Sequence, residues 1–177
     1  MMQQYSIVLS PPEPVLEQVK QWKQSLRAAI GWYKSVNALA HITFNVFEAG
    51  EERLAAWEAY LAAFVAVRQP VFLLLDHTGT FANGAFYLAP DAASELVLIR
   101  IMKDFHARAP ERASVIITTP HMSVGRGLDA GQLAIAQALI REPRIGFTCN
   151  DLVLRRFNKD RMQYDIYKRF LFAAHQE

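Results

Sequence analysis

The side chains best suited to chemistry lie in a short pattern that occurs twice, as His41-Ile42-Thr43-Phe44 and His121-Met122-Ser123-Val124. Each copy has a histidine, an apolar residue, a hydroxyl residue and a second apolar residue, in a stretch typical of a β-strand. Residues i and i+2 of a strand point to the same face, so each copy presents an imidazole beside a hydroxyl. Two such pairs facing each other would supply two proton-transfer groups and two hydrogen-bond donors. These groups suit the opening or closing of a phosphodiester without a metal.

The evidence lies in the pair of copies, because one histidine beside a hydroxyl on a strand is more often a packed sheet-edge residue. The chain has five histidines, and only His41 and His121 carry the pattern, one in each half of the sequence. The second copy extends to Arg126, which lies between Gly125 and Gly127. Strict alternation would place Arg126 on the face opposite His121. The flanking glycines favour a bend or bulge that could redirect it.

The arrangement resembles the 2H phosphoesterase superfamily and, within it, the 2′-5′ RNA ligase family, whose members carry two H-x-T/S-apolar motifs. The likeness extends to a first strand ending at Ser10-Pro11-Pro12 and to a closing hairpin formed by 147–156 and 164–167. Two departures stand out. The first motif continues as Asn45-Val46-Phe47-Glu48 where many members read F-L-G, and the second has Ser123 in place of threonine. Serine keeps the hydroxyl, so the departures bear on substrate preference rather than on mechanism.

The resemblance implies an α+β, bilobal fold over residues 1–177 as a single domain, with two similar lobes whose antiparallel sheets line a central cleft and whose helices lie outside. It implies hydrolysis of 2′,3′-cyclic phosphates at RNA ends or in small nucleotides, giving a 2′-phosphate. His41 would be the proton donor and His121 the base, with Thr43, Ser123 and Arg126 on the phosphate. Three alternatives stay open: 2′-5′ RNA ligation or opening of another cyclic nucleotide phosphate at the same site, a non-catalytic nucleotide- or RNA-binding module, and a structural protein with buried histidines.

Other residues are weaker candidates for substrate contacts. Phe81 and Tyr87 lie near a turn-rich loop, where an aromatic ring could stack on a base. Lys103, Arg155 and Arg156 could contact the backbone of a nucleic-acid strand, although a solvated strand edge explains the paired arginines as well.

Composition predicts a globular chain whose substrate is short. Hydrophobic residues make up 52% of the 177 residues and charged residues 20%, which excludes a disordered chain. The net charge is only +2, so contact with RNA must come from a local patch rather than from a global basic field.

Cysteine usage, the N-terminus and ligand spacing give expectations about compartment, cofactors and partners. The single cysteine, Cys149, permits no internal disulfide and fits a reducing compartment. The N-terminus lacks the features of a signal peptide, and no run of about 18 apolar residues occurs, so we expect a cytoplasmic protein without a membrane partner. No His, Asp, Glu and Cys set has metal-ligand spacing, and no glycine-rich phosphate loop occurs. We therefore expect no metal, no cofactor and no obligate protein partner.

Periodicity predicts the elements that would position the two motifs. Four helices are expected, over 14–31, from 51 to the break at 69–70, over 91–107, and from 129 to before Pro143. Strands are expected at 5–9, 38–47, 71–75, 85–88, 120–127, 147–157 and 162–172, with 78–84 as a loop, 158–161 as a turn and 114–118 as strand or loop. In 38–47, alternation places His41, Thr43 and Asn45 on the open face and Ile42, Phe44 and Val46 on the buried face.

Overall fold

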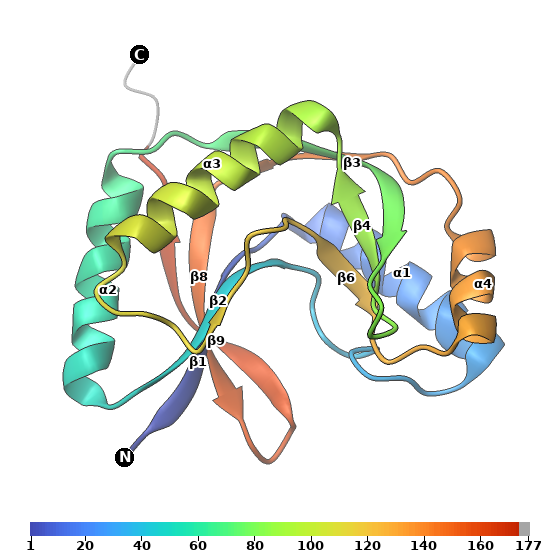
Figure 1. Cartoon of the computed structure of the whole chain (residues 1–177), viewed down its shortest axis with the longest axis horizontal. Helices are drawn as coiled ribbons and strands as arrows, with labels where there is room; N and C mark the ends of the chain where they lie inside the picture. Colours follow the sequence, from blue (N-terminus) through green and yellow to red (C-terminus); the bar gives the residue numbers. More distant parts are fainter. Residues whose placement is uncertain (174–177) are drawn as a thin grey trace.

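The computed structural model describes residues 1–173 and shows four helices around one curled antiparallel sheet (Figure 1). The expected domain over 1–177 includes residues 174–177, which lie outside the described residues. The helices are α1 (Glu13–Ile30), α2 (Glu51–Ala66), α3 (Ala92–Arg108) and α4 (Ala130–Leu139). The strands are β1 (Gln3–Leu9), β2 (Ile42–Ala49), β3 (Val71–Thr80), β4 (Phe86–Pro90), β5 (Val115–Ile116), β6 (Met122–Gly125), β7 (Ile145–Cys149), β8 (Asp151–Asn158) and β9 (Gln163–Leu171).

The sheet consists of two halves that meet at the two motif strands. Its order is β7-β3-β4-β6-β2-β1-β8-β9, and β5 lies beside β2. Strands β6 and β2 are joined through the single residue pair Ile42 and Met122. Each half therefore contributes one motif strand to the centre, which confirms the expected bilobal α+β architecture.

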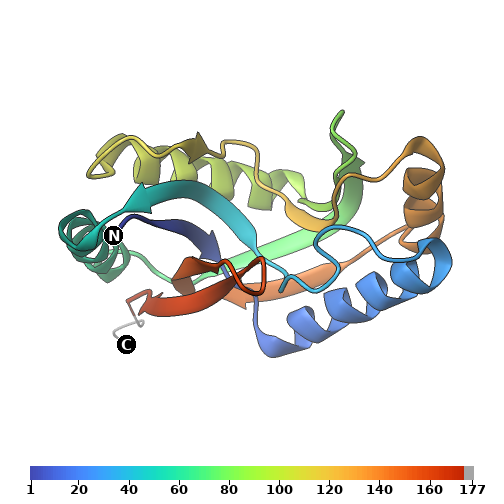
Figure 2. The ribbon, with the colours of Figure 1, turned by 90° about the horizontal axis from the view of Figure 1, so that it is seen from below.

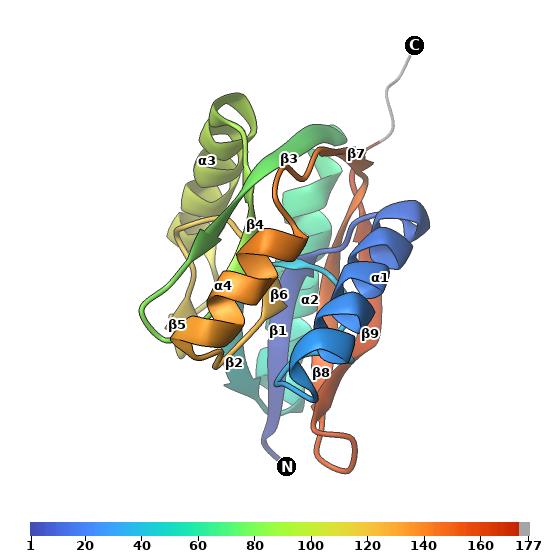
Figure 3. The ribbon, with the colours of Figure 1, turned by 90° about the vertical axis from the view of Figure 1, so that its right-hand side faces the viewer.

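The helices pack on different parts of the sheet, and α3 spans both halves, because it contacts β3 and β4 as well as Phe44 of β2. Helix α1 packs against α4 and β6, whereas α2 contacts β2, β8 and β9. Figure 2 shows α1 and α3 on opposite sides of the strands, and Figure 3 shows α1 and α4 side by side. An aromatic cluster ties β2 to the helices: the ring of Phe47 stacks on Trp57 of α2 at 4.4 Å, and Phe44 meets Phe105 of α3 edge-on at 5.2 Å. The burial of these large rings fixes the side of β2 that faces away from the cleft.

Each motif strand carries a β-bulge at the fourth residue of its motif. In β2, Val8 pairs with Thr43 and Ile7 with Asn45, so Phe44 is the extra residue. In β6, the shift lies between the partners of Phe86 and Tyr87, and Val124 is extra. A bulge puts two successive side chains on one face and exchanges the faces of all that follow.

The first bulge corrects the alternation expected for β2. Asn45 is turned to the helix side, where it is fully buried, and Val46 takes the open face. Simple alternation could not reveal this exchange, because a bulge leaves the composition of a strand unchanged.

Other boundaries also differ from expectation. The motif strands begin at Ile42 and Met122 rather than at 38 and 120, so each histidine directly precedes its strand. Strand β3 continues through residues 78–80, which were expected to be loop, because they pair with β4. The expected strand 147–157 is two strands, since β7 pairs with β3 whereas β8 pairs with β1, and the chain crosses between the halves at Asn150. Only 115–116 of the uncertain segment 114–118 form a strand, against β2.

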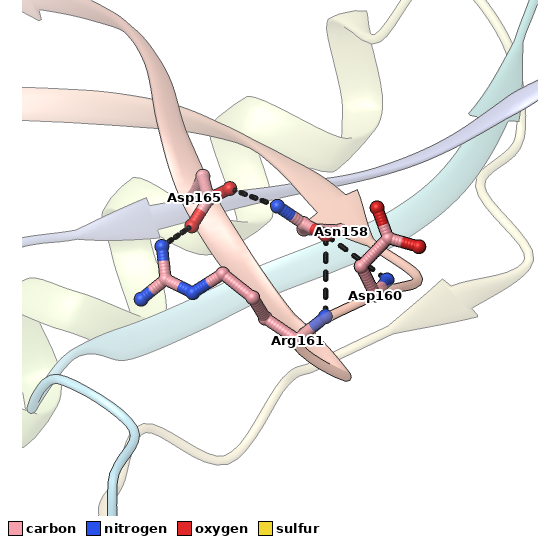
Figure 4. Close-up of polar contacts among 4 residues, drawn as sticks. All are labelled: Asn158, Asp160, Arg161 and Asp165. Carbon is pink, nitrogen blue, oxygen red and sulfur yellow. Dashed lines mark hydrogen bonds and ion pairs between the residues drawn. The ribbon is translucent and has the colours of Figure 1, made fainter.

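The β8–β9 hairpin is closed by a polar network at the expected turn (Figure 4). The Asn158 side-chain oxygen accepts hydrogen bonds from the backbone N–H groups of Asp160 and Arg161, at 3.0 and 3.3 Å. The Asn158 amide donates to Asp165 over 2.8 Å, and Arg161 pairs with the same carboxylate at 3.0 Å. These bonds fix the end of the hairpin that carries Arg155.

Candidate functional site

The pairing of β2 with β6 brings the two motifs side by side in opposite directions. Ile42 pairs directly with Met122, and both are buried on the side away from the cleft. Continuing this register by one residue each way places His41 opposite Ser123, and Thr43 opposite His121. Directly opposed residues on one face have Cβ atoms about 4.5–5.5 Å apart. The register thus sets the backbone of each histidine, which directly precedes its strand, opposite the hydroxyl residue of the other motif.

Both imidazoles are held in the same way by the backbone. His41 Nδ1 lies 2.6 Å from the carbonyl oxygen of Leu39, and His121 Nδ1 lies 2.8 Å from that of Thr119. A carbonyl oxygen only accepts, so Nδ1 of each ring carries the proton. Nε2 of each neutral ring is then the nitrogen that can take a proton from a nucleophile, or give one when protonated.

A cavity of about 650 Å³ opens beside the second motif. It is lined by Lys34, Phe81, Asn83, Ala85, Ile116, Ile117, Thr118, Thr119, His121, Ser123, Arg126 and Gly127. The expected site residues His121, Ser123 and Arg126 thus share one cavity, and the bulge at Val124 redirects Arg126 into it. His41 and Thr43 do not line this cavity, and they join the site through the β2–β6 pairing alone.

The two aromatic residues expected near the site surround His121. The ring centroid of Phe81 lies 5.0 Å from the imidazole, and that of Tyr87 lies 5.3 Å from it. The two aromatic rings are 4.5 Å apart. They therefore form an apolar wall next to the second motif, and His41 has no such aromatic contact within residues 1–173.

Arg155 lies against the other imidazole, a contact that the sequence did not reveal. Its Nη1 is 3.1 Å from His41 Nδ1, and its Nη2 donates to Ser6 Oγ over 3.3 Å. The guanidinium carbon lies 5.0 Å from the ring centroid of Tyr164. The adjacent Arg156 is exposed and lies over Tyr167, away from this site.

A second residue that sequence analysis missed is Lys23, a buried cation on α1. Its Nζ donates to the carbonyl oxygens of Ser35, at 3.0 Å, and Ala38, at 2.7 Å. These bonds hold the segment that leads to Leu39 and His41. Its position among the buried residues of an amphipathic helix was the available signal, because lysine is seldom buried without a specific role.

The charges around the histidines oppose their protonation. Burial, followed by the positive charge of Arg155, lowers the pKa of His41 well below its ordinary value. Burial also lowers the pKa of His121, with the charge of Arg126 acting in the same direction. Each charged side chain of residues 1–173 that shifts either pKa is a cation, Lys23 included. The positive charges favour binding of an anion, which would raise the pKa of both histidines.

Two further properties of the described chain bear on metals and membranes. Within residues 1–173, no group of three or more His, Cys, Asp or Glu side chains is placed to hold a metal ion. None of the helices described combines the length and apolarity needed to cross a bilayer.

Known proteins resemble this chain in fold and in family. The fold is similar to Escherichia coli LigT complexed with 3′-AMP, with 19% identity, a TM-score of 0.68, and coverage of 97% of this chain and 99% of that chain. TT0787 of Thermus thermophilus has 18% identity and a TM-score of 0.64 over 98% and 100%. Usb1 of Kluyveromyces marxianus has 11% identity and a TM-score of 0.52 over 86% and 93%. No curated protein sequence matches the chain significantly.

The sequence itself decides the family. The model of the 2′-5′ RNA ligase superfamily matches residues 11–161, a span that includes both histidine motifs. The chain belongs to the 2′-5′ RNA ligase superfamily, a group of 2H phosphoesterases.

Proposed function

We propose that this protein hydrolyses 2′,3′-cyclic phosphates of RNA ends or small nucleotides to 2′-phosphates. The observation that carries the proposal is the pairing of the motifs. Each of two imidazoles has its Nδ1–H held by a backbone carbonyl, and the pairing of Ile42 with Met122 sets each histidine opposite the hydroxyl residue of the other motif. This set supplies a base, an acid and two donors for the phosphoryl oxygens, with the two strands acting as one unit.

The reaction needs two proton transfers around phosphorus. Nε2 of His121 takes a proton from water, whose oxygen attacks the phosphorus. The bond from phosphorus to the 3′-oxygen breaks, and Nε2 of protonated His41 gives its proton to that oxygen. The products are a 3′-hydroxyl and a 2′-phosphate, and exchange with solvent restores both rings. Thr43, Ser123 and Arg126 would hold the phosphoryl oxygens during the charge change.

The order of acid and base follows the family resemblance and meets one electrostatic condition. Burial and the charge of Arg155 disfavour the protonated form of His41, so His41 serves as the acid only after negative charge on the bound substrate offsets them. Binding of the substrate thus raises the pKa of His41, the proton donor. The reverse order, with His121 as the acid, is the alternative within the same site.

A nucleotide substrate is supported by the aromatic wall and by relatives. Phe81 and Tyr87 offer ring faces next to His121, where a base could stack. E. coli LigT has been crystallised with 3′-AMP and with ATP. The name of the matching family also favours a second activity at the same site, the joining of a 5′-hydroxyl to a 2′,3′-cyclic end in a 2′-5′ linkage.

The first test is turnover of an RNA oligonucleotide that ends in a 2′,3′-cyclic phosphate, with EDTA present. We expect a 2′-phosphate product from the wild type and from His77→Ala, a control at an exposed histidine outside the site. His41→Ala and His121→Ala should each lose at least about 100-fold in kcat, the scale of acid–base catalysis. Wild-type turnover by His41→Ala would refute the scheme. Nucleotide binding without any product would favour a binding module.

A further inference from the structure

Arg155 is a buried cation without an acidic partner in residues 1–173. Arg155 is 8% exposed, and its Nε is buried with no acceptor among the described residues. Burial lowers its pKa to about 10, so the guanidinium is still charged at neutral pH. Because a buried, unpaired charge is costly, such a group suggests a negatively charged ligand.

The contact with His41 does not satisfy the guanidinium. Nη1 lies 3.1 Å from His41 Nδ1, but this nitrogen already directs its proton to Leu39 over 2.6 Å. Ser6 Oγ, on Nη2, is the neutral acceptor that remains. Nε is itself enclosed by protein, so the N–H groups of Nη1 are the ones left to bind an anion beside the first motif.

The number of charges indicates that the anion bound by Arg155 is not the reacting phosphate. A 2′,3′-cyclic phosphate carries one negative charge, and Arg126, directly after β6, lines the cavity next to His121 and can balance it. Arg155 lies on β8, beyond β2 and β1 in the sheet order. Three strand spacings make about 14 Å between β6 and β8. The second guanidinium thus approaches from the far side of the first motif, with a positive charge that the reacting group leaves unbalanced.

We propose that Arg155 binds a second phosphate, carried on the 5′-oxygen of the nucleoside whose 2′,3′-cyclic phosphate is opened. This proposal rests on the proposed function. The 5′-oxygen is the remaining ribose hydroxyl of such a nucleoside that can carry a phosphate. The phosphate has two sources, the phosphodiester that joins the terminal nucleotide to an RNA chain, or the 5′-phosphate of a mononucleotide. The Ser6 hydroxyl and the Tyr164 ring hold the guanidinium in place before the ligand arrives, and the closed turn at Asn158 holds the end of the β8–β9 hairpin (Figure 4).

The test compares kcat/KM for three substrates with the same reacting group. They are adenosine 2′,3′-cyclic phosphate, its 5′-phosphorylated form, and the dinucleotide ApA ending in a 2′,3′-cyclic phosphate. We expect the wild type to favour both 5′-substituted substrates by about 10- to 100-fold over the unsubstituted one, as charged hydrogen bonds do. A preference for the dinucleotide alone would identify RNA as the source, and a preference for the phosphorylated mononucleotide alone would identify a small nucleotide.

Variants of the paired arginines then identify the residue responsible. Arg155→Gln should abolish the preference for the 5′-phosphate, and Arg155→Lys should keep part of it. Arg156→Gln, which removes the neighbouring exposed guanidinium, should leave it unchanged. The readout is the ratio between substrates within each variant, so a change in His41 or a loss of folded protein affects both members of the ratio and cancels. A wild type without the preference, or Arg155→Gln with it intact, would overturn the proposal.

A binding measurement separates this proposal from the proposed function. Calorimetry would compare adenosine 3′,5′-bisphosphate with 3′-AMP on the wild type and Arg155→Gln, with no turnover required. Tighter binding of the bisphosphate by the wild type alone supports the Arg155 subsite even if no substrate is hydrolysed. Equal binding of the two ligands by the wild type contradicts it, whatever the outcome of the hydrolysis assay.

Discussion

At the scale of single residues, the site is a place where neutral histidines are surrounded by cations. Burial lowers the pKa of each ring below its ordinary value of 6.5, and the charges of Arg155 on His41 and of Arg126 on both rings act in the same direction. Acid–base catalysis by the pair needs one ring protonated and the other neutral. Burial and the nearby cations therefore set the pH at which the free protein holds one protonated and one neutral imidazole.

This electrostatic setting predicts an acidic pH optimum. With both pKa values lowered, the fraction of molecules that hold one proton on the pair declines as the pH rises above 6.5. We expect kcat/KM to be greater at about pH 6 than at about pH 8. Arg155→Gln removes the positive charge beside His41, raises the pKa of that ring and moves the profile to higher pH. A pH profile of kcat/KM measures both effects, with Arg156→Gln as the control, and an unchanged profile in Arg155→Gln would contradict this account.

A second residue-scale prediction concerns Asn45 and stability. Its amide is fully buried, with neither Oδ1 nor Nδ2 bonded within residues 1–173, beside a cavity of about 310 Å³. An unsatisfied buried amide costs about 1–3 kcal/mol, so Asn45→Leu should raise the free energy of unfolding by a comparable amount. The nearly isosteric Asn45→Asp should lower it, because it would bury a charge. Urea denaturation tests both, and a less stable leucine variant would show that the amide has a partner.

At the scale of elements, α1 fixes the entry to the first motif strand. Lys23 binds two carbonyl oxygens of the segment before His41, and Tyr33 donates a hydrogen bond to the Lys23 carbonyl at 3.2 Å. Helix, loop and strand are thereby linked through one buried ammonium group. Burial and the charge of Arg126 lower the pKa of Lys23 to about 8.

The buried lysine predicts how stability changes at alkaline pH. The unfolded chain keeps the Lys23 proton to about pH 10.5, whereas the folded chain releases it near pH 8. The unfolded state then binds more protons on this lysine between these values, so the free energy of unfolding should rise from about pH 8 to about pH 9. From about pH 9 the raised pKa of Cys149 acts in the opposite direction, and at higher pH the raised pKa of Tyr33 adds to it.

Denaturation of two variants of α1 measures this effect. Lys23→Met should abolish the alkaline rise, and it should lower stability by about 1–3 kcal/mol at neutral pH by leaving the two carbonyls unpaired. Lys20→Met, on the exposed face of the same helix, should retain the rise. If Lys23→Met still becomes more stable over the same alkaline range, another group is responsible.

At the scale of the molecule, the two halves of the sheet depend on one junction. Ile42 and Met122 are the paired residues of β2 and β6, and both are nearly or fully buried. The alignment of each imidazole with the opposite hydroxyl depends on the packing of these two side chains. Catalytic geometry and global stability therefore share the same contact.

Shortening one side chain at the junction should affect both properties. Met122→Ala should lower the free energy of unfolding by about 2–5 kcal/mol through the cavity it leaves. It should also lower kcat, although Met122 contacts no substrate in the proposed site. Met122→Leu, which conserves volume, should cost less than about 1.5 kcal/mol and keep turnover. Equal turnover by all three proteins would show that the junction does not set the alignment.

Much of this architecture could be predicted from local sequence, and the rest depends on distant contacts. The histidine-hydroxyl spacing, the helix periodicity and the Asn158 turn are local signals, and they predicted the elements and the motif positions. The division of 147–157 at Asn150 depends on β3 and β1, which pair with its two parts. The contact of Arg155 with His41 joins residues 114 positions apart, and nothing local to either residue signals it.

The antiparallel register at Ile42 and Met122 relates the two motifs by an approximate twofold axis. A ribose cyclic phosphate has no such symmetry, so the backbone alone gives it two equivalent ways to bind. Its orientation must be imposed by side chains that break the symmetry. The bulges give the second motif Arg126 where the first has Val46, and the aromatic wall stands only beside His121 among the described rings. Exchanging these features between the halves should turn the substrate around, so that His121 becomes the acid and His41 the base.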